Sequence, residues 1–204
     1  MKAQPTLPIS GRRKVWRALP SALVLICMIV ASPSLCAASG VWSVEHAASR
    51  VGFVTSFGGV RVAGDFPRWD AQIRFDPRDL SRASVVAVLD MRAVRTGNPD
   101  QEQALPTAVF FDATAFPQAR FEAHTFRALG GDRYVAQGNL TLRGVTRPLT
   151  LPFTLSISNG VATMNGQAAI SRLAFGVGQN EWKATDTLPD QVTATVSIRA
   201  RLLP

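Results

Sequence analysis

Apolar and polar side chains alternate along most of this chain, and the longest example covers residues 134–157. Alternation with a period of two is typical of a β-strand that buries one face and leaves the other in water. The stretch predicts two adjoining strands, separated by a turn over residues 144–148. Residues 192–202 repeat the pattern, with Val, Ala, Ile and Leu on one face and Thr, Ser and Arg on the other.

Further strands are expected wherever the same alternation returns. They cover residues 41–46, 50–57, 60–66, 69–75, 84–91, 120–126 and 161–171. The first four follow one another through very short connections, which is typical of an antiparallel meander. Eight to ten such strands favour closure, because a closed barrel has no exposed edge. The sequence therefore predicts an all-β fold, an antiparallel β-barrel of about eight strands.

The alternation stops over residues 92–117, where Pro99, Pro106 and Pro117 punctuate a segment rich in Asp, Gln, Glu and Ala. This predicts a long excursion with a short helical turn near residues 107–112, whose phenylalanines face inward. Two interpretations stay open for this segment. It either caps one end of the barrel or is an inert crossover on the surface.

The first 38 residues differ in character from the rest and predict a cleaved export signal. Arg12 and Arg13 belong to a basic start, an apolar run follows over residues 19–31, and small residues lead to cleavage after Ala38. The run is shorter than the roughly 20 residues that a helix needs to span a bilayer. Paired arginines also occur in twin-arginine signals, so the export route stays open. We expect a periplasmic or secreted protein whose mature domain covers residues 39–204.

Removal of this segment would lower the net charge of the protein and remove its cysteines. Cys27 and Cys36 are the two cysteines of the chain, so the mature domain has no disulfide and depends on core burial for stability. Five of the 22 basic residues also lie there, which leaves 17 against 14 acids and lowers the net charge from +8 to +3. With no run of Lys or Arg, the mature domain is not expected to bind nucleic acid.

Alternation does not say whether the apolar face points into the barrel or toward lipid. An outer-membrane barrel has strands of roughly 9 to 11 residues and aromatic girdles, whereas several strands here are shorter and Tyr134 is the single tyrosine. We therefore expect the apolar face to point inward. An eight-stranded barrel is either filled by its own side chains or holds one small ligand. Small residues on the inward face favour a tunnel: Gly64, Ala71, Ala87, Ala123, Gly138, Ala194 and Ala200.

Four segments together resemble one known family. They are GNLTLRGVTRPLTL at residues 138–151, FDPRDLSRASV at 75–85, FFDATAFPQARFEA at 110–123 and SRLAFGVG at 171–178. With them the chain resembles the YceI-like, polyisoprenoid-binding proteins over residues 41–203. The resemblance implies an exported, lipocalin-like barrel that holds a long isoprenoid, such as a polyprenyl phosphate or an isoprenoid quinone, in an apolar tunnel.

Three positions depart from the family pattern. Ala48 and Ser49 stand where the family often has a His-Ser pair, and Phe57 and Ala104 replace two further histidines. The resemblance therefore extends to the tail tunnel, and it does not carry over the recognition of a head group.

The expected ligand site combines the large inward side chains with one charge. The lining residues are Phe53, Phe57, Val62, Phe66, Trp69, Ile73, Phe75, Leu89, Phe121, Leu140, Leu142, Phe153 and Phe175. Arg172 joins them because the resemblance places an arginine before the turn at Phe175 and Gly176. Two roles stay open for Arg172, a contact with a phosphate or quinone oxygen at the barrel mouth and a hydrogen-bonded anchor for its loop.

Nothing in the mature chain indicates catalysis. Its two histidines, His46 and His124, have no metal-ligand spacing, and no nucleophile elbow or glycine-rich phosphate loop occurs. We expect a carrier or scavenger that is not an enzyme, with no metal and no cofactor other than a non-covalently bound isoprenoid lipid. Transient membrane contact for lipid exchange and a homodimer stay open. Two rival functions also stay open, a packed barrel that binds partners through its surface and an accessory enzyme with an unrecognised site.

Overall fold

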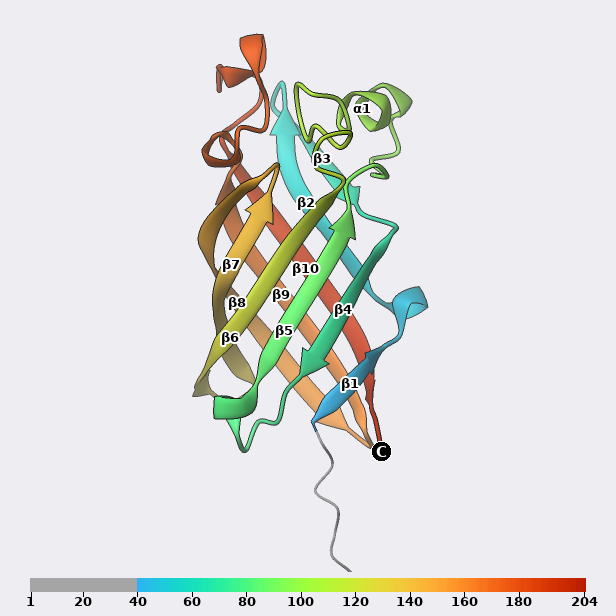
Figure 1. The fold of residues 1–204 in the computed structure, drawn as a ribbon, viewed down its shortest axis with the longest axis vertical. Coiled ribbons are helices and arrows are strands. Elements are labelled where there is room, and N and C mark those ends of the chain that lie inside the picture. Colours follow the sequence, from blue (N-terminus) through green and yellow to red (C-terminus); the bar gives the residue numbers. More distant parts are fainter. Residues whose placement is uncertain (1–39) are drawn as a thin grey trace, which may run out of the picture. The chain divides into compact units, whose positions relative to one another are not determined.

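The computed structural model describes residues 40–204, and the expected export signal over residues 1–38 lies outside the described residues. Ten strands form one antiparallel sheet (Figure 1). They are β1 Val41–Val44, β2 Arg50–Phe57, β3 Val60–Asp65, β4 Trp69–Arg74, β5 Ser84–Asp90, β6 Gln118–Gly130, β7 Arg133–Leu142, β8 Val145–Ser158, β9 Val161–Ser171 and β10 Gln191–Leu202. One α-helix, α1 Pro99–Ala104, and four 3-10 turns complete the described chain: η1 His46–Ala48, η2 Leu80–Arg82, η3 Leu173–Phe175 and η4 Asn180–Lys183.

The sheet closes into a barrel through β10. One edge of β10 pairs with β9 along its whole length, and the other edge pairs with β2 at one end and β1 at the other. The short turn η1 separates β1 from β2, so these two act as one interrupted strand. Strands β3 and β4 form a second interrupted strand, because β3 pairs with β2 and β4 pairs with β1. Counted this way the barrel has eight strands, which confirms the predicted fold class.

One expectation about local structure is wrong, and a second one misses a helix. The turn between β7 and β8 contains only Arg143 and Gly144, both left-handed, rather than residues 144–148. Pro148 instead lies inside β8, opposite Asn139. A proline is tolerated there because its missing N–H faces the edge of β8 that β7 does not use.

The helix of the excursion also lies earlier than expected. It occupies α1, where the Asn98 side chain accepts hydrogen bonds from the N–H groups of Asp100 and Gln101, and Pro99 occupies the first turn. An Asn cap followed by Pro is a strong helix start. Residues 107–112 form hydrogen-bonded turns, in which the N–H of Phe110 donates to the carbonyl of Thr107 at 3.0 Å, and are not part of this helix. The expected inward direction of Phe110 and Phe111 is confirmed, because both line the barrel interior. The excursion lies over the end of the barrel beside β2 and β3 (Figure 1).

Asp90, at the end of β5, joins two arginines and gives the fold a defined acid response. Its carboxylate accepts a 2.8 Å hydrogen bond from Arg92 Nε and lies 3.0 Å from Arg68 Nε. The hydrogen bonds from Arg92 lower the pKa of Asp90 to about 2. A lowered folded-state pKa contributes stability above the unfolded pKa, and this contribution is lost as the pH falls from about 4 to about 2.

Asp90→Asn is therefore expected to lower the free energy of unfolding by about 1 kcal/mol at neutral pH, after allowance for solvent screening. The difference from the wild type should shrink as the pH falls through that window. Urea denaturation at pH 7, 4 and 2 measures it, with the exposed Asp186→Asn as the control. A difference that stays constant over this pH range would contradict the assignment.

Candidate ligand cavity

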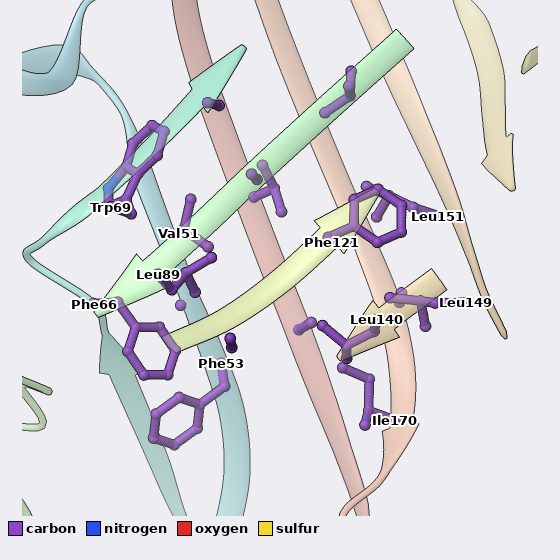
Figure 2. A pocket seen from close by; sticks show the side chains of 18 of the residues that line it. Val51, Phe53, Phe66, Trp69, Leu89, Phe121, Leu140, Leu149, Leu151 and Ile170 are labelled. Carbon is purple, nitrogen blue, oxygen red and sulfur yellow. The ribbon is translucent and has the colours of Figure 1, made fainter. Parts of the chain in front are cut away.

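A cavity of about 290 Å³ lies inside the barrel. Inward side chains from strands on all sides of the barrel form its wall. Figure 2 shows 18 of them and labels ten, among them Phe53, Trp69, Phe121 and Leu149. Several inward side chains, such as Leu89 and Leu140, are only half-buried although they point away from solvent. The protein's own side chains therefore leave part of the interior unfilled.

Small side chains that neighbour large ones on adjacent strands leave this space. Ala71, Ala87 and Phe121 lie in one row across β4, β5 and β6. Ala168 and Ala194 form a similar row with Phe53 across β9, β10 and β2. All six side chains line the cavity. The register thus places alanines where a filled core would need larger residues.

An aromatic cluster closes the end of the cavity that lies away from α1. The ring of Phe75 is 5.6 Å from that of Phe126, 5.4 Å from Tyr134 and 6.0 Å from Phe153. Phe75, Phe126 and Phe153 are buried in the larger of two apolar clusters. Edge-to-face contacts of this kind stabilise beyond simple burial, so this end forms a firm floor.

Loops cover the opposite end. The ring of Trp182 lies 5.8 Å from that of Phe57 and 5.7 Å from that of Phe110. The N–H groups of Gly178 and Gln179 both donate to the carbonyl of Val109, at 3.0 and 2.9 Å. These contacts join the excursion to the loop after β9. The cap interpretation of the excursion is therefore the one that the structure supports.

Apart from the indoles of Trp42 and Trp69, the polar side chains that line the cavity in the described chain are those of Thr55 and Arg172. Thr55 lies next to Val54, which pairs with Thr193 near the start of β10. The main-chain N–H of Arg172 donates to the carbonyl of Asp190, the residue just before β10. Both therefore lie near the loop end of their strands. Within residues 40–204 the buried hydroxyl of Thr55 has no hydrogen-bond partner.

Arg172 is an anchor for its own loop. Its Nε donates to the carbonyl of Pro189 at 2.9 Å, its Nη1 to Val177 at 3.0 Å and its Nη2 to Leu188 at 2.7 Å, with a fourth bond to Ala184. The residue is 3% exposed. Burial lowers the pKa of Arg172 and Asp190 opposes this, but a guanidinium remains charged. Of the two roles left open by the sequence, the structure shows the loop anchor.

Arg172→Met is expected to lower the free energy of unfolding by about 3 kcal/mol, because it leaves buried carbonyls without donors. Hydrogen exchange should accelerate across residues 176–190 in particular. Urea denaturation and mass-resolved hydrogen exchange measure the two effects, with Arg127→Met at an exposed position as the control. Equal stability of the two variants would show that the loop does not depend on this side chain.

Most of the expected lining residues do border the cavity. These are Phe53, Phe66, Trp69, Ile73, Phe75, Leu89, Phe121, Leu140, Leu142, Phe153 and Arg172. Ala71, Ala87, Ala194 and Ala200 from the expected small set also border it. Ala123 instead packs with no exposed surface, and Gly138 lies directly against it. The structure brings these lining side chains together, while their contact with a ligand stays a prediction.

Three expected residues do not line the cavity. Phe57 is 42% exposed at the tip of the β2–β3 hairpin, beyond the barrel wall. Val62 lies on β3, which pairs with β2 alone at that level, so its side chain is not enclosed by a second wall. Phe175 is buried in the smaller apolar cluster and is not itself among the residues that border the cavity. For Phe57 and Val62, the alternation predicted the correct face of the strand but not the point at which the strand extends past the barrel wall.

Sequence reasoning missed the lining residues of the loops. Leu105 and Leu188 border the cavity from irregular segments, where no periodic signal exists. Met164, Ala168 and Ile170 of β9 also border it, and their even spacing was a usable signal.

The histidines of the described chain pair with single acids on the surface. Within residues 40–204 no three His, Cys, Asp or Glu side chains lie close enough together to hold a metal ion. His46 lies 3.6 Å from Asp70 and His124 lies 3.2 Å from Glu122, and all four side chains are exposed. In the same part of the chain no helix has the length and apolar character needed to cross a membrane.

Comparison with known proteins agrees with this architecture. The model of the YceI-like domain matches residues 42–201. A UPF0312 protein of Yersinia pestis is 34% identical over 93 residues, and one of Vibrio cholerae is 27% identical over 90 residues. Each match covers 48% of the relative's length, so the aligned region spans about half of these curated relatives.

Solved structures extend the comparison to most of the chain. BcnA of Burkholderia cenocepacia is 30% identical with a TM-score of 0.75, covering 77% of this chain and 99% of BcnA. A YceI protein of Campylobacter jejuni has a TM-score of 0.61 at 21% identity, covering 69% of this chain and 85% of that protein, and shows the fold alone. The chain belongs to the YceI-like domain family.

Proposed function

We propose that the protein binds the tail of a long isoprenoid lipid inside its barrel and acts as a carrier or scavenger in the periplasm or outside the cell. The observation that carries the proposal is the cavity itself, an apolar hollow with an aromatic floor and with its polar side chains near the other end. An isoprenoid lipid has a matching distribution of apolar and polar groups, because its branched hydrocarbon tail ends in one polar head group. The tail would lie toward Phe75 and the head toward the loops.

Burial of the tail provides enough free energy for binding. If about 500 Å² of ligand leaves water, the gain at about 25 cal/mol per Å² is about 12 kcal/mol. Association and ordering cost roughly 4 to 15 kcal/mol. At the low end of that range about 8 kcal/mol remains, which corresponds to micromolar affinity without a catalytic or ionic group. Discrimination between isoprenoids with similar tails is expected to be weak.

The head group meets few partners inside the barrel. The bonds of Arg172 are occupied by loop carbonyls, which leaves the Thr55 hydroxyl to pair with a ligand oxygen. One hydroxyl suits an uncharged oxygen such as that of a quinone. A phosphate buried there would lack partners at a high cost, so the phosphate of a polyprenyl phosphate would have to lie outside the mouth in water.

Exchange with a membrane is part of the proposal. Phe57 and Val60, at the tip of the β2–β3 hairpin beside the covered end, are 42% and 69% exposed. Exposed apolar side chains near the mouth support brief contact with a lipid surface.

Native mass spectrometry and lipid extraction of the purified protein test the function. A prenyl lipid that remains bound in the gas phase and is recovered by extraction is the expected result. A protein that stays free of ligand when incubated with prenyl lipids would support the rival surface-binding module, and turnover of a lipid ester would support the rival enzyme. Either outcome would overturn the carrier.

A further inference from the structure

The barrel wall is unpaired along half of one strand boundary. Strands β8 and β9 pair from Ser158 and Val161 to Phe153 and Gly166, and the ladder then stops. In the described chain, residues 145–152 of β8 continue to pair with β7, and residues 167–171 of β9 continue to pair with β10. We call the unpaired stretch between residues 145–152 and 167–171 the seam. It opens toward the loop end of the barrel.

Two prolines explain why the ladder stops. The N–H of Leu155 donates to the carbonyl of Asp132 on the β7 side. Because N–H groups alternate between the two edges of a strand, the even-numbered positions of β8 point toward β9. Pro148 and Pro152 occupy two of these positions and have no N–H to donate. The seam is therefore encoded in the sequence of β8.

The seam leads directly to the cavity. Leu149 and Leu151 on its β8 side and Ala168 and Ile170 on its β9 side all line the hollow, and three of them are labelled in Figure 2. The outward-facing residues along it are exposed: Pro148, Thr150, Pro152, Gln167 and Ala169. Along the seam, a thin layer of apolar side chains therefore separates the cavity from solvent.

One side chain bridges the loop end of the seam. The Nε of Arg147 on β8 donates a 2.7 Å hydrogen bond to the carbonyl of Ala174 in the turn after β9. Arg147 is exposed, so water competes for this bond, and a single exposed hydrogen bond adds little stability. The bridge can open without disturbing either neighbouring ladder.

We propose that the isoprenoid tail enters and leaves the barrel sideways through the seam, with Arg147 as its latch. This rests on the proposed function. End-on entry would require a long branched tail to thread past the contacts between Trp182, Phe57 and Phe110. Sideways entry needs only the separation of two edges that the ladder between β8 and β9 does not join beyond Phe153 and Gly166.

A chemical crosslink across the seam tests the route. Thr150 and Ala169 are exposed and lie where the ladder would pair them if it continued, so Thr150→Cys with Ala169→Cys places two thiols across the seam. Thr154→Cys with Asn165→Cys is the matched control, because these exposed residues are already paired. Both pairs are made in the full chain with Cys27→Ser and Cys36→Ser, and a short bis-maleimide joins the thiols.

Stopped-flow fluorescence with a dansylated farnesol measures loading and release. Crosslinking the seam is expected to slow both rates roughly tenfold or more, because it blocks the gating step, while crosslinking the control pair leaves them unchanged. Arg147→Gln should accelerate both rates. Pro148→Thr with Pro152→Thr should slow them by restoring the missing donors, and this variant keeps the test valid if the crosslink disturbs the fold.

Two failures are distinguishable. Equal rates in the crosslinked and uncrosslinked seam variants would overturn sideways entry while leaving the carrier intact. If the probe fails to bind even the uncrosslinked protein, the proposed function itself is wrong.

Discussion

Replacing Phe53 with aspartate is expected to abolish lipid retention, whereas the same charge at Arg74 leaves retention unchanged. Phe53 lines the cavity from β2, and Arg74 is exposed on β4. An aspartate at position 53 would place a carboxylate in an apolar space without a partner, at a cost of several kcal/mol. Part of that cost would be met by admitting water, which competes with the tail for the same volume.

Lipid extraction after identical purification measures retention, and circular dichroism reports whether each variant is folded. Because Phe53→Asp also destabilises the barrel, Phe53→Asn provides an uncharged variant that introduces polarity at lower cost. It should retain less lipid than the wild type and remain folded. Equal retention by the variants at positions 53 and 74 would show that the β2 face has been assigned to the wrong side.

Filling the hollow is expected to displace the ligand without destabilising the protein. Ala87 lies between Ala71 and Phe121 in the middle of the wall, and Ala87→Trp would occupy the space that these small residues leave. In a packed core such a change costs about 1 to 3 kcal/mol through overpacking. In a hollow it buries apolar surface instead, so the ligand-free variant should be at least as stable as the ligand-free wild type.

Denaturation of delipidated protein and lipid extraction together check this. Gln72→Trp is the matched control, because Gln72 neighbours Ala71 on β4 but is exposed, and it should affect neither property. A loss of several kcal/mol in Ala87→Trp would indicate that the interior is already filled. That outcome would favour the rival view of a packed barrel that works through its surface.

Alternation along the chain was sufficient to predict the strands and the closed barrel. In β10 every inward residue from Val192 to Ala200 lines the cavity, as its period of two requires. Errors arose where a local signal depended on a distant neighbour. Pro148 looks like a turn residue, and only the unpaired edge of β8 explains how a strand accommodates it. The pair Asn98 and Pro99 is a recognisable helix start, but the helical structure of the excursion was expected only at residues 107–112.

The site was less predictable than the fold for a related reason. Whether small residues leave a hollow depends on the register that brings Ala71, Ala87 and Phe121 into one row, and alternation does not determine register between strands. The anchoring role of Arg172 depends on carbonyls of an irregular loop. Phe57 and Val62 have the right parity, but β2 and β3 extend past the wall.

The most direct test of a hollow that takes a hydrocarbon tail is calorimetric titration of delipidated protein with prenyl alcohols of two, three and four isoprene units. Each unit adds five carbons, and at about 0.8 kcal/mol per buried CH₂ a fully buried unit adds up to about 4 kcal/mol, so the affinity should rise by up to about a thousandfold per unit until the cavity is full. A hollow interior predicts this stepwise rise, and it predicts that Ala87→Trp abolishes the rise. An affinity that does not change with tail length would contradict it.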